Sequence, residues 1–103
     1  MYLYIGINGC VAAIDPQDGR GIWRTELGSG FFSSTTGSDV CVLEHDGRVF
    51  AGCMGHVFAL DGMTGEILWQ NDLEGMGHND VTLSIAGKSI QFVATHTHTR
   101  SQS

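Results

Sequence analysis

One motif occurs twice in the chain, at positions 13–23 and 59–69, so that equivalent positions lie 46 residues apart. The positions shared by the two copies are Ala13, Asp15, Gly19 and Trp23 in the first, and Ala59, Asp61, Gly65 and Trp69 in the second. Identities continue outside the motif at Gly6/Gly52, Gly9/Gly55, Val11/Val57 and Leu27/Leu73, with Tyr4 replaced by Phe50. A repeat of this length indicates either a propeller blade or a helical array.

The apolar pattern favours strands over helices. No segment shows a sustained i, i+3, i+4, i+7 pattern, and the apolar residues form short runs bounded by Gly and Asp. Each copy therefore predicts three strands in succession. The predicted strands are 2–7, 10–15, 21–27, 40–44, 48–53, 56–61, 66–73, 81–86 and 89–95.

The repeated Asp and Gly are typical of a turn between the second and third strands of each copy. The carboxylates of Asp15 and Asp61 can accept hydrogen bonds from the backbone of this turn. Gly19 and Gly65 fit a left-handed backbone position that closes it. Because this role in the turn accounts for both aspartates, the sequence does not favour a catalytic role for them.

The second strand of each copy is apolar on both faces, as the segment 57–60 (Val-Phe-Ala-Leu) shows. Such a strand is expected to be covered on both sides, and stacked small sheets of a propeller would cover it. Ala13 and Ala59 would leave room for a Trp from a neighbouring repeat. We therefore interpret Trp23 and Trp69 as core-packing residues rather than as a platform for ligand stacking.

The strand order predicts an all-β chain, a partial propeller of about two blades of four-stranded antiparallel sheet. Residues 1–27 form a partial blade, 39–73 a complete one and 81–95 the start of the next, which gives three, four and two strands before a polar tail at 96–103. A closed propeller needs at least four blades, so edges and apolar faces should be exposed. Self-association, a protein partner that completes the ring, or a longer parent chain would each cover them. A longer parent is the favoured expectation.

The two copies resemble the PQQ-like (quinoprotein) β-propeller repeat, whose pattern is Ala-x-Asp-x-x-Thr-Gly-x-x-x-Trp, the tryptophan-docking motif. The second copy matches every named position, with Thr64 at the Thr, whereas the first has Asp18 there. The resemblance covers roughly residues 2–95. In that family the Trp packs between blades, so the resemblance implies a structural role for Trp23 and Trp69.

The resemblance to catalytic quinoprotein dehydrogenases is limited to the scaffold. Those enzymes hold calcium and PQQ at the propeller centre, often beside adjacent cysteines, and use an Asp as base. Cys10, Cys41 and Cys53 are not adjacent, and no Asp or Glu can be matched to a metal or base position. The resemblance therefore implies no catalytic, cofactor-binding or metal residue in this chain.

Composition limits the partners. The chain of 103 residues is 42% hydrophobic and 16% charged, which is typical of a compact fold. Its net charge is −6 and its five basic residues are scattered, which disfavours nucleic-acid and membrane surfaces. Three cysteines without C-x-x-C spacing indicate neither a disulfide framework nor a zinc site, although one disulfide and one free thiol remain an alternative. With no visible signal peptide, free thiols favour the cytoplasm.

Other candidate residues have simpler interpretations. His96 and His98 could form a metal pair on one strand face, but no third ligand is apparent and a solvated tail is favoured. His45, His56 and His78 are interpreted as structural or surface residues, because no nucleophile or carboxylate is spaced to orient them. The Ser/Thr run at 33–36 is interpreted as loop.

The sequence favours a non-catalytic scaffold or binding module, and leaves enzyme activity open. One alternative is a fragment of a PQQ-dependent dehydrogenase-like enzyme, which would take PQQ with calcium. Another is a protein like the bacterial outer-membrane assembly propellers, which would need export. Fold class alone does not decide among these functions.

Overall fold

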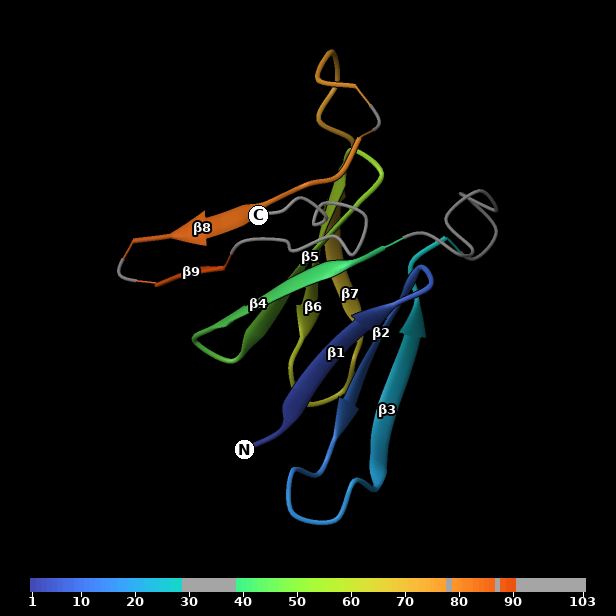
Figure 1. The fold of residues 1–103 in the computed structure, drawn as a ribbon, viewed down its shortest axis with the longest axis vertical. Coiled ribbons are helices and arrows are strands. Elements are labelled where there is room, and N and C mark those ends of the chain that lie inside the picture. Colours follow the sequence, from blue (N-terminus) through green and yellow to red (C-terminus); the bar gives the residue numbers. More distant parts are fainter. Residues whose placement is uncertain (29–38, 78, 87, 91–103) are drawn as a thin grey trace, which may run out of the picture.

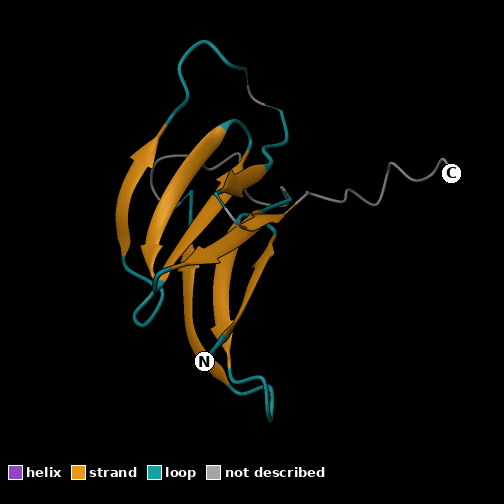
Figure 2. Cartoon of the chain, turned by 90° about the vertical axis from the view of Figure 1, so that its left-hand side faces the viewer, coloured by secondary structure: helices purple, strands orange, loops and turns teal. Residues whose placement is uncertain are grey.

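The computed structural model describes residues 1–28, 39–77, 79–86 and 88–90. In these ranges the chain consists of strands and loops, which form three antiparallel sheets in chain order (Figures 1 and 2). The strands are β1 (Leu3–Ile7), β2 (Cys10–Ile14), β3 (Gly21–Glu26), β4 (Cys41–His45), β5 (Arg48–Cys53), β6 (His56–Asp61), β7 (Ile67–Asn71), β8 (Leu83–Ile85) and β9 (Lys88–Ile90). The sheets have the orders β1-β2-β3, β4-β5-β6-β7 and β8-β9, which confirms the predicted all-β fold with its three, four and two strands.

Two-residue hairpins fix the register within the sheets. The β1–β2 turn has φ of 51° at Asn8 and 73° at Gly9, and the β5–β6 turn has 48° at Met54 and 79° at Gly55. Positive φ at both central residues is the geometry whose twist matches that of the flanking strands. Residues 46–47 form the β4–β5 turn in the same way, with φ of 53° and 79°. The glycine-containing turns predicted from the sequence therefore close the hairpins.

Strand bounds agree best in the middle of the second sheet. Strands β5 and β6 have the predicted bounds, and each has a neighbour on both sides. The edge strand β7 covers Ile67–Asn71 rather than 66–73, and β8 covers Leu83–Ile85 rather than 81–86. An edge strand extends only as far as its single neighbour pairs with it. The pattern of apolar residues does not show where this pairing ends, so the sequence predicts edge strands that are too long.

The hydrophobic core lies between the first two sheets. Strand β1 lies against β4, and β4 lies against β8 and β9, so the three sheets follow one another side by side (Figure 1). The buried core residues are Val11, Leu27, Val40, Val49, Ala51, Cys53, Phe58 and Leu60. Phe58 and Leu60 are the largest fully buried side chains in the described residues, so the second sheet supplies most of the core.

A glycine at the same repeat position allows each sheet to approach the next. A Cβ built on Gly6 would lie 2.6 Å from the carbonyl oxygen of Val40, and one built on Gly52 would lie 2.6 Å from Cγ1 of Val81. Any side chain would force the neighbouring segment outward. The identity of Gly6 and Gly52 in the two copies therefore reflects the spacing between sheets.

Burial of the central strands differs between the two copies. Every residue from Phe58 to Leu60 in β6 is buried, whereas β2 alternates between buried and half-buried positions. The prediction of a strand covered on both faces thus holds for β6 and only in part for β2. The reason is that the second sheet stands between the first sheet and the β8–β9 hairpin, while the first sheet has a described neighbour on one side.

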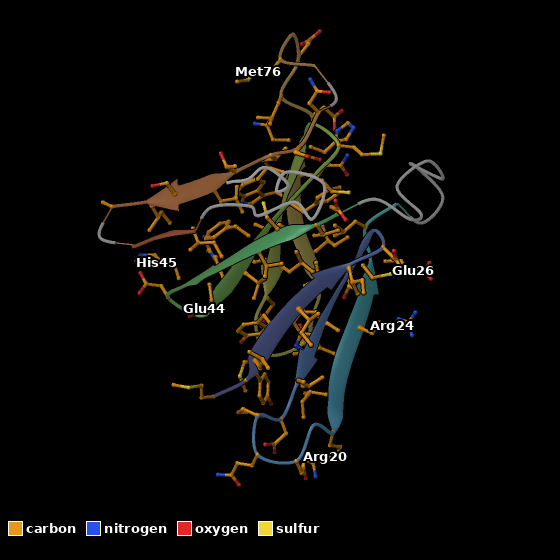
Figure 3. The ribbon with its side chains drawn as sticks, in the orientation of Figure 1. Arg20, Arg24, Glu26, Glu44, His45 and Met76 are labelled. Carbon is orange, nitrogen blue, oxygen red and sulfur yellow. The ribbon has the colours of Figure 1, made fainter. Side chains whose placement is uncertain are left out.

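Large apolar side chains are exposed on β1 and on β7. Leu3 and Ile7 on β1 are 50% and 58% exposed, and Trp69 on β7 is 45% exposed. Ile67 and Leu68 beside it are also exposed. Charged side chains lie on the outer face of β3, where Arg24 and Glu26 point away from the second sheet (Figure 3).

Several sequence interpretations lie outside the described residues: the Ser/Thr run at 33–36, His78, the strand portion 91–95, His96, His98 and the tail 96–103. In the part of the chain that the structure describes, no helix is long and apolar enough to cross a membrane.

Candidate functional site

The two repeat turns, residues 15–19 and 61–65, have the same backbone hydrogen bonds. In the first, the Gly19 N–H donates to the Asp15 carbonyl (2.7 Å); in the second, the Gly65 N–H donates to the Asp61 carbonyl (2.8 Å). The two glycines have φ of 78° and 82°. The Asp side chains stabilise the turns as well, since Oδ1 accepts from the backbone N–H two residues ahead at 2.8 Å in both copies.

Asp18 takes the place of the Thr in the repeat pattern, and its side chain makes the same hydrogen bond to the backbone as Thr64 does. In the second turn, the Glu66 N–H donates to Oγ1 of Thr64 (3.2 Å). In the first, the Arg20 N–H donates to Oδ1 of Asp18 (2.9 Å). Asp and Thr side-chain oxygens can both bond a backbone N–H two residues ahead. The exchange therefore leaves the shape of the turn unchanged.

Three side chains of the first sheet hydrogen-bond to the second repeat turn. The indole N–H of Trp23 donates to the Gly62 carbonyl (3.0 Å), and the Tyr4 hydroxyl donates to the same oxygen (3.1 Å). The Thr25 hydroxyl donates to the Gly65 carbonyl (2.6 Å). The rings of Tyr4 and Trp23 also pack together, with centroids 6.0 Å apart. We call this arrangement the inter-repeat contact.

Gly65 has a second role in the inter-repeat contact. A Cβ on Gly65 would lie 2.4 Å from Cε3 of Trp23 and 2.8 Å from Oγ1 of Thr25. The indole ring thus occupies the space that a side chain would need. The sequence analysis explained this glycine only by its left-handed backbone. It did not predict that Tyr4, Thr25 and Gly62 take part in a contact between the repeats.

The equivalent residues of the other copy, Trp69 and Gly19, make no such contact in the described residues. Trp69 packs on Phe50 with ring centroids 6.1 Å apart, but its side chain is 45% exposed. No atom lies within 4 Å of a Cβ built on Gly19. One copy of the turn is therefore covered by a Trp, and the other is open.

The alanines of the motif lie opposite the Trp of their own repeat. Ala13 pairs with Trp23 across β2 and β3, and Ala59 pairs with Trp69 across β6 and β7. In both pairs a register shift follows directly after the alanine. Both alanines are fully buried. The sequence analysis expected the alanines to leave room for a Trp from the neighbouring repeat. Trp23 instead takes the space at Gly65.

His56 and Asp72 form a second candidate site. His56 is 8% exposed, and its Nδ1 lies 3.1 Å from Oδ1 of Asp72. The antiparallel pairing of β6 with β7 brings the two residues together, since Val57 lies opposite Asn71. The prediction that no carboxylate orients this histidine was therefore wrong. The partner lies 16 positions along the chain, beyond the range of a local motif.

The His56–Asp72 pair lines an open cavity of about 480 Å³. The other lining residues are Leu73, Glu74, Gly75 and Gly77. A carboxylate-oriented histidine can act as a general base when a nucleophile or substrate proton lies within reach. Among the described residues, this lining contains no Ser, Thr, Cys or Lys, so these residues alone define no nucleophilic reaction.

The other titratable candidates are His45 and the three cysteines. His45 is the last residue of β4 (Figure 3), and its Nε2 lies 3.2 Å from Oδ2 of its neighbour Asp46. Cys10, Cys41 and Cys53 are free thiols, and the Cys41 thiol donates to the Val81 carbonyl (2.7 Å). Among the described ranges, no three His, Cys, Asp or Glu side chains are grouped so that they could hold a metal ion.

Alkaline pH is expected to destabilise the fold. Burial raises the pKa of the Cys53 thiol from 9.0 to about 11, and burial, then the charge of Glu44, raises the pKa of Tyr4. Both groups hold their protons more tightly when folded. The stabilisation from the Cys53 thiol is complete below about pH 9 and is lost as the pH rises toward about 11. The stabilisation from Tyr4 is lost at a pH above the ordinary tyrosine pKa of 10.0. The melting temperature should fall across this window, and less steeply in Cys53→Ala. Equal slopes in the two proteins would contradict this assignment.

The three antiparallel sheets follow one another along the chain, and each packs on the next. This arrangement of repeated sheets defines the chain as a segment of a β-propeller. A family model described as outer membrane protein assembly factor BamB matches residues 8–100, and the chain belongs to this family of PQQ-like repeats. The matched range includes both copies of the motif. No curated protein matches the chain.

Proposed function

We propose that this chain is a non-catalytic PQQ-like repeat segment, which serves as a scaffold or protein-binding module within a larger propeller. The observation that carries the proposal is that motif residues shape their own turns, and that Trp23 and Gly65 hold the first repeat on the second. The Asp15 and Asp61 carboxylates bond their own turns, and the Trp23 indole bonds the Gly62 carbonyl. The hydrogen bonds of these side chains therefore serve the architecture.

The chemistry of the two candidate sites supports the same proposal. The inter-repeat contact consists of hydrogen bonds to backbone carbonyls and of ring packing, which are structural interactions. The described lining of the His56–Asp72 cavity contains a histidine oriented by a carboxylate and no Ser, Thr, Cys or Lys. The name of the matching family describes an assembly factor, which agrees with a module that holds other proteins. The three free thiols favour a reducing compartment for this module.

A titration with PQQ and calcium distinguishes this proposal from a dehydrogenase-like fragment. We expect no saturable binding of PQQ by isothermal calorimetry, with or without calcium, because no described residues form a calcium-binding group. Calcium should likewise leave the melting temperature unchanged, since a ligand stabilises only the state that binds it. Stoichiometric, calcium-dependent PQQ binding would overturn the non-catalytic proposal. A titration with magnesium in place of calcium controls for general cation effects.

A further inference from the structure

We propose that the cavity beside His56 binds a positively charged side chain of a partner protein, specifically an arginine. This inference rests on the proposed function as a protein-binding module and names the chemistry of the partner that the module accepts. The cavity has a volume of about 480 Å³, which lies in the usual range for binding pockets. It is located where the second repeat departs from the path of the first.

The departure begins directly after the last strand of each repeat. In the first repeat, the Leu27 N–H donates to the Gly9 carbonyl (2.9 Å), and the Leu27 side chain is buried in the core. In the second, the Leu73 N–H donates instead to Oδ1 of Asn71 (2.8 Å), and Leu73 has φ of 49°. A positive φ is uncommon for a bulky residue. The segment after β7 therefore leaves the sheet by a different route, and the cavity lies beside it.

His56 supplies the inner wall of this cavity. Its side chain is only 10% exposed. The imidazole packs against the Phe58 ring, with centroids 6.5 Å apart, and its Nδ1 lies 3.1 Å from Oδ1 of Asp72. Because the ring is held from two sides, this wall is preformed. Leu73 adds apolar surface, along which the aliphatic part of a long charged side chain can pack.

Carboxylate oxygens in the lining are available to a ligand. Oδ1 of Asp72 is engaged by His56 and also accepts from Nε2 of Gln70 (2.8 Å). In the described ranges, Oδ2 of Asp72 and the carboxylate of Glu74 have no hydrogen-bond partner. The described lining also contains no Arg or Lys. Two carboxylates without a cation of their own favour a positively charged occupant.

The surroundings of the cavity strengthen its negative potential. In the pairing of β5 with β6, Cys53 lies opposite His56. Burial, and then charges that include those of Asp39 and Asp80, raise the pKa of the Cys53 thiol. These two carboxylates are therefore close enough to act at this end of the second sheet. The chain as a whole has a net charge of −6, which attracts positively charged partners over a longer range.

The shape of the lining fits arginine better than lysine. A guanidinium group has five N–H donors in a planar fork and is weakly hydrated, whereas an ammonium group is a compact and strongly hydrated charge. One edge of the fork can pair with the Glu74 carboxylate and another N–H with Oδ2 of Asp72. Gly75 and Gly77 also line the cavity, and nothing lies within 4 Å of a Cβ built on either. The backbone that carries the arginine can therefore approach closely.

A titration with two short peptides tests the inference. The probe is acetylated Gly-Arg-Gly amide, and its control contains citrulline, a neutral analogue of arginine. In nitrogen–proton correlation spectra, the arginine peptide should shift the amide signals of His56 and residues 72–77 in a saturable manner. The citrulline peptide should not. Added salt should weaken the binding, because it screens the attraction between opposite charges.

Matched variants locate the binding site. Glu74→Gln removes a charged acceptor from the cavity and should weaken binding of the arginine peptide about tenfold. Glu26→Gln removes the same charge at position 26, the counterpart of Asp72 in the first repeat, which lies outside the described cavity lining. This variant should bind as the native chain does. Circular dichroism verifies that both variants are folded.

Four outcomes would overturn the arginine site. The arginine peptide could leave the spectra unchanged, or the citrulline peptide could bind equally well. Equal weakening in Glu74→Gln and Glu26→Gln would show a general charge effect without a specific site. Calcium chloride that shifts the same signals and displaces the peptide would assign the cavity to a metal ion. These titrations contain no PQQ, so the proposed scaffold function can fail or survive separately.

Discussion

Replacement of Trp23 by alanine is expected to lower the free energy of unfolding by about 3 kcal/mol, the lower end of the usual cost of truncating a core aromatic side chain, because Trp23 is half-buried. The variant loses the indole packing on Gly65 and the hydrogen bond to the Gly62 carbonyl. It also leaves Tyr4 without its ring neighbour. Urea unfolding followed by far-ultraviolet circular dichroism measures the change. The loss should appear as a lower midpoint, because the contact joins the first two sheets.

Trp69→Ala is the matched control for Trp23→Ala. The two residues share the same repeat position and the same type of ring neighbour, but Trp69 is 45% exposed. At a concentration where the chain is monomeric, its truncation should cost about 1 kcal/mol or less, as is usual for exposed positions. Equal losses for the two variants would show that the inter-repeat contact does not stabilise the fold.

Replacement of Gly65 by asparagine is expected to cost about 1–3 kcal/mol, because an added Cβ would collide with the Trp23 ring and overpacking of a filled site is costly. Asparagine tolerates the positive φ at this position, so the loss measures the collision rather than backbone strain. The same urea titration reports the change. The emission of Trp23 should shift to longer wavelength, since its ring would be displaced into water.

Gly19→Asn provides the comparison for Gly65→Asn. The two glycines have φ of 78° and 82° and close the same type of turn. Nothing lies within 4 Å of a Cβ at Gly19, so the monomer should lose no more than about 1 kcal/mol. If both variants lose the same amount, backbone strain rather than the indole collision explains the requirement for glycine at position 65.

The sequence predicted the strands and hairpins well because these depend on local pattern. Runs of apolar residues between glycine-containing turns identified all nine described strands. The bounds of β5 and β6 were right because each is paired along its whole length. The edge strands β7 and β8 were shorter than predicted, because pairing with one neighbour, rather than composition, decides where they end.

The candidate sites were less accessible to sequence reasoning because they depend on pairing and packing across the chain. The repeat identified Gly6 and Gly52 as equivalent, but only the approach of Val40 and Val81 explains why both are glycine. The neighbour of His56 was missed because β6–β7 pairing, rather than local spacing, brings Asp72 to it.

The contacts that hold the first sheet point forward along the chain. Trp23 bonds a carbonyl 39 positions ahead, Thr25 one 40 positions ahead and Tyr4 one 58 positions ahead. During synthesis, the first three strands therefore emerge from the ribosome well before the residues that complete their packing. At usual elongation rates of about 5–20 residues per second, that interval lasts several seconds. A nascent chain of this kind gains its full stability late, and nascent-chain-binding chaperones have time to act on each sheet before the next one arrives.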